Sequence, residues 1–566
     1  MAHRIPTIIN GKASIVSIPS VTKPSRKTFG LTKPLNVALP TPADLQKSDE
    51  LYETLRSRNS MENYAELSHR ETVLAKIDAL VEQWVHDLSI SRGMASDQAR
   101  NLGGRIYPFG SYRLGVHDKG SDMDLLCVVP RNIARTDFFS SFLHLLKTHP
   151  EATSCLAVQE AYVPVIKTKF DGLDIDLLFA RLTLARIPRD LNLREGMQLK
   201  NLDEQSVRSV NGYKINEELL DLVPNVETFQ LALRAIKLWA KPNGVYSNVL
   251  GYFGGVSCAI LVARVCQLYP NAAAATIVNK FFLIYSNWNW PQPVLLNKPD
   301  DLKLGFPEWN SNPRAGQHLM PIITPVYPQQ NSVYNVSQST ITIIREALMQ
   351  GFKVTENIMV DKASWSDLFR GPSFFMKYQH FLVVMASSTN PSDQLMWCGL
   401  VQSRLRHLTL NLEYNRLVRL SQVHTKCYEE DEQNCAERMK DKEAGVMSDI
   451  CTIFDICIWF VGLKFEKHLN IHPDLTEAIY DFTNGVYNNN IYRDGCQVEV
   501  RQIKQNQLAE YLDKQLLRKE FSRYSDDQSV SSSTGESSEI SGKRSPNEEL
   551  RGHTTKKQRT ISGASR

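Results

Sequence analysis

The chain has 566 residues, enough for about three domains at ~150 residues each plus tails. Its 65 basic and 61 acidic residues leave a net charge of +4, so any nucleic-acid surface has to be local. Residues 251–269 are the most hydrophobic stretch, but Arg264 interrupts them and the clean run is too short to cross a bilayer. We therefore expect a soluble intracellular protein with no membrane association.

The first 90 residues predict an arm followed by a helix. Residues 1–50 are rich in Pro, Ser, Thr and Lys and show little periodicity, which predicts an extended arm. Apolar residues then recur at helical spacing and predict a helix over 68–90. They are Leu74, Ile77, Val81, Trp84 and Leu88.

Residues 104–180 predict a mixed α/β unit in which Gly172 marks a hairpin-like turn between two strands. The predicted elements are strands over 123–129, 161–171 and 173–180 and a helix over 139–148.

Residues 216–300 are predicted to be helical, with the clearest helices over 228–241 and 251–269. A loop region rich in Pro and Asn follows over 300–337. Further on, strand–helix–strand–helix patterns predict a small α+β domain. Its elements are a strand over 373–388, a helix carrying Trp397, Val401, Leu405 and Leu408, a strand over 453–466, and a helix after Asp474.

The strongest local signal is a Gly-Ser turn, Gly110-Ser111, followed after ten residues by Asp122-Met123-Asp124 at the head of an apolar strand. Strand alternation places the two aspartates on the same face, about 6.6 Å apart along the chain. Two such carboxylates can flank hard cations, and the turn can present backbone N–H groups and a hydroxyl to phosphate.

A second Asp-x-Asp pair, Asp174 and Asp176, heads another apolar strand about 50 residues later. If that strand lies beside the first, one of its carboxylates can complete a three-carboxylate site for two divalent ions, as in phosphoryl transfer. A lone Asp-x-Asp before a strand is usually only a polar strand entry, but the whole pattern is far more specific and favours a nucleotidyltransferase.

The sequence resembles the nuclear eukaryotic poly(A) polymerases of the polymerase-β-like nucleotidyltransferase superfamily from about residue 20 to about 500. The segments that carry the resemblance are FGSYRLGVHDKGSDMDLLCVVP (109–130), VPVIKTKFDGLDIDLLFARL (163–182), LRAIKLWAKPNGVYSNVLGYFGGVSCAILVARVCQLYPNA (233–272) and HLMPIITPVYPQQNSVYNVS (318–337).

The resemblance implies a set of site residues. Asp122, Asp124 and Asp176 match the catalytic, metal-binding carboxylates for two Mg²⁺ or Mn²⁺ ions. The matched ATP-binding positions are Phe109, Gly110, Ser111, Asp118, Met123, Asn211, Lys237, Tyr246, Gly255 and Val256, together with the three aspartates. Asp118 is a departure, because the family usually carries threonine or another small neutral residue there, and a carboxylate would repel phosphate unless a metal or Lys119 screens it.

The resemblance also implies an α/β and α multi-domain fold: a polymerase-β-like palm, a helical central domain and an RRM-like RNA-binding domain. The expected boundaries are an N-terminal arm and helix packing on the central domain (1–65), the catalytic domain (66–215), the central domain (216–362), the RNA-binding domain (363–515) and a disordered Ser-rich tail (516–566). Aromatic residues of the RNA-binding domain could stack on RNA, although most of them fit a core better; they are Phe374, Phe375, Tyr378, Phe381 and Trp459.

Basic residues of the tail have the spacing of a bipartite nuclear localisation signal, which predicts a nuclear protein and binding to an import receptor. They are Lys543, Arg544, Lys556, Lys557 and Arg559.

The expected activity is template-independent transfer of AMP from ATP to the 3′ end of pre-mRNA, by a monomer that meets the cleavage and polyadenylation factors. The preference for adenine comes from the resemblance and not from the spacing. A uridylyl- or CCA-adding transferase and an inactive RNA-binding scaffold are the alternatives.

Overall fold

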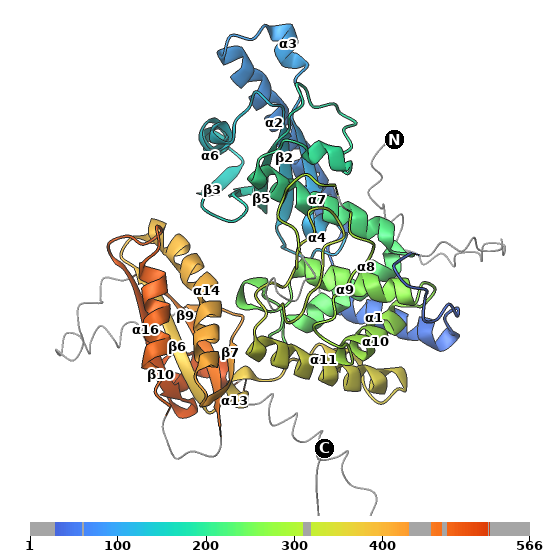
Figure 1. The fold of residues 1–566 in the computed structure, drawn as a ribbon, viewed down its shortest axis with the longest axis vertical. Helices are drawn as coiled ribbons and strands as arrows, with labels where there is room; N and C mark the ends of the chain where they lie inside the picture. The colour runs from blue at the N-terminus through green and yellow to red at the C-terminus, as the bar shows by residue number, and fades with distance from the viewer. Residues whose placement is uncertain are drawn as a thin grey trace, which may run out of the picture.

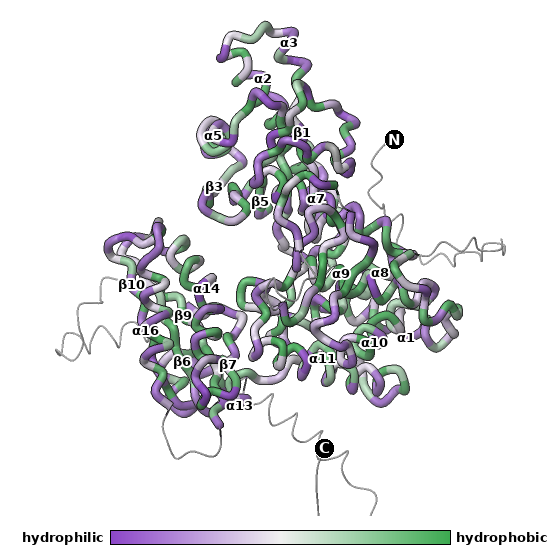
Figure 2. The backbone as a smooth tube through the Cα atoms, viewed as in Figure 1, coloured by the Kyte–Doolittle hydropathy of each residue, from purple (hydrophilic) through white to green (hydrophobic). Residues whose placement is uncertain are grey.

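A computed structural model of the chain describes residues 29–58, 61–300, 302–309, 318–429, 454–466, 473–518 and 520. Figure 1 shows three parts: a sheet with its helices at the top, a helical body below it, and a second sheet beside that body. Hydrophobic residues gather inside these parts, for example along β6 and β9 (Figure 2). The predicted localisation signal lies outside the described residues. None of the described helices is long and apolar enough to span a membrane.

The first sheet has the order β1-β2-β5-β4-β3. Only β2 and β5 are parallel; the other pairs are antiparallel. Asp171 and Gly172 both have positive φ between β4 and β5, which confirms the predicted hairpin. The strands are β1 (Arg105–Phe109), β2 (Met123–Val129), β3 (Ala152–Val158), β4 (Val165–Phe170) and β5 (Leu173–Arg181).

Helices cover both faces of this sheet. Alternate residues of β2 face opposite sides, so that Leu125 packs with residues of α2 (Tyr64–Ser91), while Leu126 packs with residues of α7 (Glu204–Leu222). By the same alternation Asp122 and Asp124 lie on the α7 side. The remaining helices of this part are α3 (Ser96–Arg100), α4 (Gly110–Arg113), α5 (Arg135–Asp137), the π-helical η1 (Phe138–Phe142), α6 (Leu143–Thr148) and the 3₁₀ turn η2 (Gly196–Leu199).

The helical body is built around α9, whose residues from Ser257 to Leu268 are all buried. The N-terminal helix α1 (Pro42–Ser57) packs against α10 and α8 of this body. The extended arm predicted for residues 1–50 is therefore wrong from Pro42 onward. Thr41 and Asp44 form a reciprocal capping box that starts α1. The other elements are α8 (Val226–Ala240), η3 (Asn248–Leu250), α9 (Gly255–Leu268), α10 (Ala274–Ser286), α11 (Gln338–Met359) and α12 (Trp365–Leu368).

The second sheet has the strand order β10-β6-β9-β7, with β8 also paired to β9 and with α14 and α16 as its two long helices. The chain order β-α-β-β-α-β with this strand order is the RRM-like arrangement that was predicted. The elements are α13 (Phe374–Lys377), β6 (His380–Ser388), α14 (Pro391–Tyr414), β7 (Val418–Val423), β8 (Tyr428–Glu429), β9 (Phe454–Phe465), α16 (Thr476–Tyr487), β10 (Cys496–Lys504) and η5 (Gln505–Glu510).

Three details of this domain bear on the predictions. The strand predicted over 373–388 is divided, because α13 turns back and places Phe375 against Phe381 and Phe460 of the sheet, with ring centroids 6.1 and 5.2 Å apart. All five aromatics considered for stacking on RNA are buried, so none of them offers a ring to a base in this conformation. The disordered tail predicted from residue 516 begins too early, since Leu517 is buried in the core.

Candidate active site

The register of the first sheet brings the two Asp-x-Asp segments together. Asp124 of β2 is directly paired with Asp176 of the parallel strand β5. On either side of this pair lie Phe109 of β1 and Lys167 of β4, so the four residues form one row across the sheet. The sequence alone left open which carboxylate of the second segment joins the first, and the register selects Asp176.

The three carboxylates repel one another. Burial, followed by the charges of Asp122 and Asp176, raises the pKa of Asp124 to about 7. Burial also raises the pKa of Asp176, although Lys167 donates to its Oδ2 at 2.6 Å and lowers it in part. A cluster of oxygen donors with this excess of negative charge suits a hard divalent cation.

Among the residues that the structure describes, no three Asp, Glu, His or Cys side chains are already drawn together into a metal cage. The donor set nevertheless fits hard cations, because it consists of carboxylate oxygens only. Lys167 takes one of the Asp176 oxygens, so a cation at this oxygen would compete with its ammonium group.

The Gly110-Ser111 turn lies directly against these carboxylates. Gly110 has φ +66°, and a Cβ atom on it would lie 1.8 Å from Asp124 Oδ2, so only glycine fits. The Gly110 N–H donates to Asn216 Oδ1 of α7 at 2.6 Å. Asn216 is a buried positioning residue that the sequence analysis missed, and nothing in the weakly patterned α7 sequence singles it out.

Helix α8 holds the loop that leads from α4 into β2. Gln230 Nε2 donates to the Leu114 carbonyl, Arg234 to the carbonyls of Gly115 and His117, and Lys237 Nζ to that of Val116. Burial lowers the pKa of the Lys237 ammonium group, and no carboxylate of the described ranges bonds to it. It therefore brings an unneutralised positive charge close to Asp118 and Asp124.

The other residues implied by the resemblance lie around this centre. Asp118 accepts a bond from Lys241 at 2.5 Å, which neutralises the unexpected carboxylate from α8 rather than from Lys119. Tyr246 is bridged to Phe253 and has its hydroxyl 3.4 Å from where a Cβ of Gly255 would be.

The three remaining residues that the resemblance implies, Val256, Met123 and Asn211, differ in how deeply they are buried. Val256 is 40% exposed at the start of α9 and leaves an open surface beside Gly255. The side chain of Met123, the first residue of β2, is fully buried, so only the backbone of this residue can face a ligand. Asn211 is buried on α7 and donates to the Pro328 carbonyl at 3.3 Å, while its Oδ1 finds no partner within the part of the chain that the structure describes.

Three family models match consecutive segments of the chain: the poly(A) polymerase nucleotidyltransferase domain (30–223), the poly(A) polymerase central domain (228–371) and the poly(A) polymerase predicted RNA-binding domain (373–521). The chain belongs to the poly(A) polymerase family.

Two poly(A) polymerases of other organisms are similar to this chain over most of its length. A poly(A) polymerase of Dictyostelium discoideum is 39% identical over 494 residues, which are 86% of this chain and 59% of that protein. Poly(A) polymerase PAPalpha of Candida albicans is 43% identical over 403 residues, 71% of this chain and 72% of that protein. The match to a solved structure of the Cid1 poly(U) polymerase with MgGTP bound has a TM-score of 0.41 and 14% identity over 58% of this chain and 99% of that one.

Membership in the poly(A) polymerases confirms the predicted fold and enzyme class, a polynucleotide adenylyltransferase with nucleotidyltransferase, central and RNA-binding domains. The family's reaction is template-independent adenylyl transfer to RNA 3′ ends. Enzymes of this kind use a nucleotide substrate and divalent metal ions.

Proposed function

We propose that this chain adds AMP from ATP to the 3′ end of pre-mRNA and releases pyrophosphate, with Asp122, Asp124 and Asp176 as the ligands of two Mg²⁺ or Mn²⁺ ions. The observation that carries this assignment is the pairing of Asp124 with Asp176 across two parallel strands. It places carboxylates from two distant segments side by side, on the face of the sheet that α7 covers. When bound, the two ions supply activation of the attacking 3′-hydroxyl and stabilisation of the leaving pyrophosphate.

The chain's own residues orient the nucleotide. The close approach of the Gly110 backbone to Asp124 brings this turn beside the carboxylates, where its backbone can face a phosphate chain, and the hydroxyl of Ser111 lies in the same turn. Lys237 supplies positive charge to the triphosphate from α8. Tyr246, Gly255 and Val256 form the wall on which the nucleoside rests, with the exposed Val256 side chain as its apolar surface.

The finer cellular role rests on the sequence. The basic pairs of the tail support a nuclear protein carried by an import receptor, and a pre-mRNA acceptor implies contact with cleavage and polyadenylation factors. We also propose that the enzyme acts as a monomer, because all three aspartates come from one chain and one sheet.

Extension of a labelled RNA primer in four separate reactions with ATP, UTP, CTP or GTP tests the proposal. We expect long products with ATP and either Mg²⁺ or Mn²⁺. Preferential use of UTP would make the chain a uridylyltransferase, addition limited to a short CCA would make it a CCA-adding enzyme, and RNA binding with no product would make it a scaffold.

A further inference from the structure

The loop over 114–122 carries Asp122 at its end, but it makes few bonds within itself. The Ser121 N–H donates to the Asp118 carbonyl at 3.0 Å, and the Asp118 N–H donates to Ser121 Oγ at 3.1 Å. These bonds close a turn that contains Gly120 at positive φ. They leave the Ser121 carbonyl, which belongs to the peptide bond before Asp122, to be held by another part of the chain.

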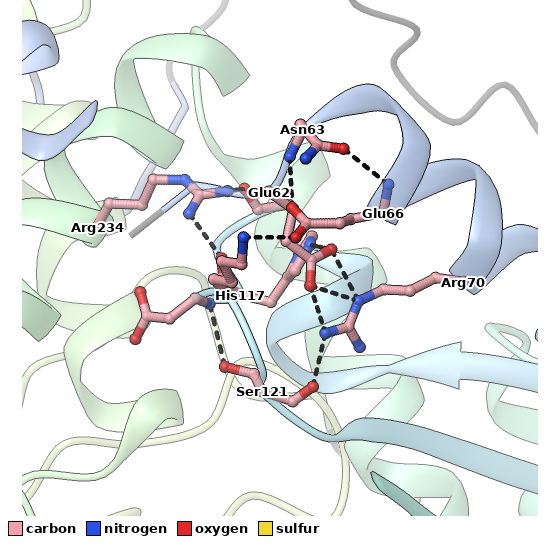
Figure 3. A network of polar contacts seen from close by, with 10 residues as sticks. Glu62, Asn63, Glu66, Arg70, His117, Ser121 and Arg234 are labelled. Atoms are coloured by element: carbon pink, nitrogen blue, oxygen red, sulfur yellow. Dashed lines mark hydrogen bonds and ion pairs between the residues drawn. The ribbon is translucent and has the colours of Figure 1, made fainter. Parts of the chain in front are cut away.

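Arg70 of α2 supplies that contact. Its side chain is completely buried, and its Nη2 donates to the Ser121 carbonyl at 2.7 Å (Figure 3). The same guanidinium group donates from Nε and Nη2 to the Glu62 carboxylate at 2.8 and 2.6 Å. Because the guanidinium is planar and two of its bonds go to the Glu62 carboxylate, its orientation is fixed, and it therefore sets the position of the Ser121 carbonyl that it also bonds.

Glu62 extends the contact to the other end of the loop. Its carboxylate is buried and lies 3.1 Å from His117 Nε2, while the His117 carbonyl accepts from Arg234 of α8 (Figure 3). Burial lowers the pKa of His117 to about 4, so its ring is neutral near pH 7. Glu62 and Arg70 therefore form one buried ion pair that touches the loop at both His117 and Ser121.

The stability of the fold does not by itself explain why the Arg70–Glu62 ion pair is buried here. Burying two charges costs several kcal/mol of desolvation, and well-packed apolar residues of similar size often serve the fold as well or better. Arg70 Nη1 is also buried and has no hydrogen-bond partner among the described residues, so the group is not placed to maximise its own bonding. One of its donors, Nη2, instead reaches the Ser121 carbonyl, in the peptide that leads into Asp122.

We propose that Arg70, held by Glu62, is a positioning residue for the transfer reaction: it fixes the Ser121–Asp122 peptide and so aims the Asp122 carboxylate at the metal site. This inference rests on the proposed function of Asp122. It adds that the rigidity of the loop comes from α2, a helix that contributes no metal ligand.

The test uses the full chain with Arg70→Met, which keeps the length of the side chain and removes its donors. We expect cooperative melting to persist, kcat for primer extension with ATP to fall ~10- to 100-fold, and the KM for ATP to change less than ~3-fold, as for a misplacement of about 1 Å at a reacting centre. Amide hydrogen exchange over 114–122 is expected to rise in the metal-free protein, a readout that does not depend on activity.

Arg92→Met is the matched control. Arg92 also bridges a carbonyl and a carboxylate of the same domain, bonding the Asn132 carbonyl at 2.9 Å and Asp137 at 2.5 Å, but at the surface and away from the site. It should leave both readouts unchanged.

A folded Arg70→Met protein with wild-type kcat would overturn the inference, and so would a lower kcat with unchanged exchange over the loop. If Arg70→Met does not melt cooperatively, Glu62→Gln is judged by the same two criteria, because it keeps the shape of the pair while weakening the grip on Arg70. Failure of the proposed function is distinguishable, since it would appear as full activity of a variant lacking the Asp124 carboxylate.

Discussion

At the scale of single residues, the site depends on how closely the Gly110 backbone approaches the Asp124 carboxylate. An alanine Cβ at Gly110 would overlap Asp124 Oδ2 and would also require a positive φ that alanine disfavours. We expect Gly110→Ala to lower kcat by ~100-fold, because the carboxylate has to move. Steady-state primer extension measures this.

Gly93→Ala separates the two causes. Gly93 also has positive φ, +87°, but no atom of the described residues lies within 4 Å of the direction of its Cβ, and it stands outside the loop that carries Asp122. This control should cost only ~1 kcal/mol of stability and leave kcat near that of the wild type. Equal losses in both variants would show that backbone strain, not the contact with Asp124, explains the effect.

The raised pKa of Asp124 implies that this carboxylate lowers the stability of the metal-free protein at neutral pH, although it is needed for activity. Its pKa is raised from the usual value of 3.8 to about 7, so the folded state loses stability as pH rises from about 4 to about 7 and the carboxylate ionises. Asp124→Asn removes this loss. We expect the metal-free variant to melt a few degrees above the wild type at pH 8 and at the same temperature near pH 3.5.

Activity should move in the opposite direction. Asp124→Asn should lower extension by ~10³-fold or more, since the three carboxylates act as a unit. Asp174→Asn is the control, because Asp174 lies in the same strand but pairs with Lys169 rather than with Asp124. Loss of extension in the Asp174 variant with retention in the Asp124 variant would contradict the assignment of Asp176 through the register.

At the scale of elements, α8 holds the loop that leads to Asp122 and carries Lys237, the residue proposed to face the triphosphate. Replacing Lys237 by Met removes the buried ammonium group that bonds the Val116 carbonyl. We expect the KM for ATP to rise at least ~10-fold while the affinity for RNA, measured by filter binding, stays the same. Lys353→Met on the exposed side of α11 should change neither quantity.

The long strands and helices were predictable because they bury one clear face or run through the core, as β2, β5 and α2 do. Strand β1 was missed because Pro108 interrupts its apolar pattern, and the structure accepts this proline at the edge of the sheet. The residue pattern around Pro42 predicted an arm rather than helix α1, and only the resemblance implied a helix within residues 1–65, although the Thr41–Asp44 capping box is itself a helix-start signal.

The aspartates proposed to bind metal could be picked out from spacing and resemblance, but the residues that hold them in place could not. Asn216, Arg70 and Glu62 act through contacts with residues 106, 51 and 55 positions away in the chain. Such contacts leave no local pattern, because a single buried polar residue in a helix reads like any other polar residue. The pairing register that selects Asp176 over Asp174 is likewise set only when β2 and β5 pair, so it cannot be read from the local sequence.

At the scale of the whole molecule, the C-terminal boundary of the folded part can be tested directly. Leu512 and Leu517 are buried in the main core, although the tail was predicted to begin at 516. Removing residues 521–566 should leave the melting temperature and primer extension unchanged. Removing residues 511–566 should lower the melting temperature by several degrees, because two apolar side chains are lost from the core.

The truncation that ends at 520 also tests localisation. It lacks the basic residues of the tail, so we expect a fluorescent fusion to spread from nuclei to the cytoplasm while its extension activity in extracts is retained. If the truncated fusion stayed in nuclei, Lys543, Arg544 and the Lys556–Arg559 cluster would not be the nuclear localisation signal that we propose.

The central claim is that one sheet brings Asp122, Asp124 and Asp176 together to hold divalent ions over a triphosphate. A crystal of the chain grown with Mn²⁺ and a non-hydrolysable ATP analogue tests it most directly, through the anomalous scattering of manganese. The account predicts manganese peaks bonded to oxygens of all three aspartates, with the phosphate chain beside Gly110 and Lys237. Manganese and nucleotide bound elsewhere, with Asp176 still paired to Lys167, would contradict it.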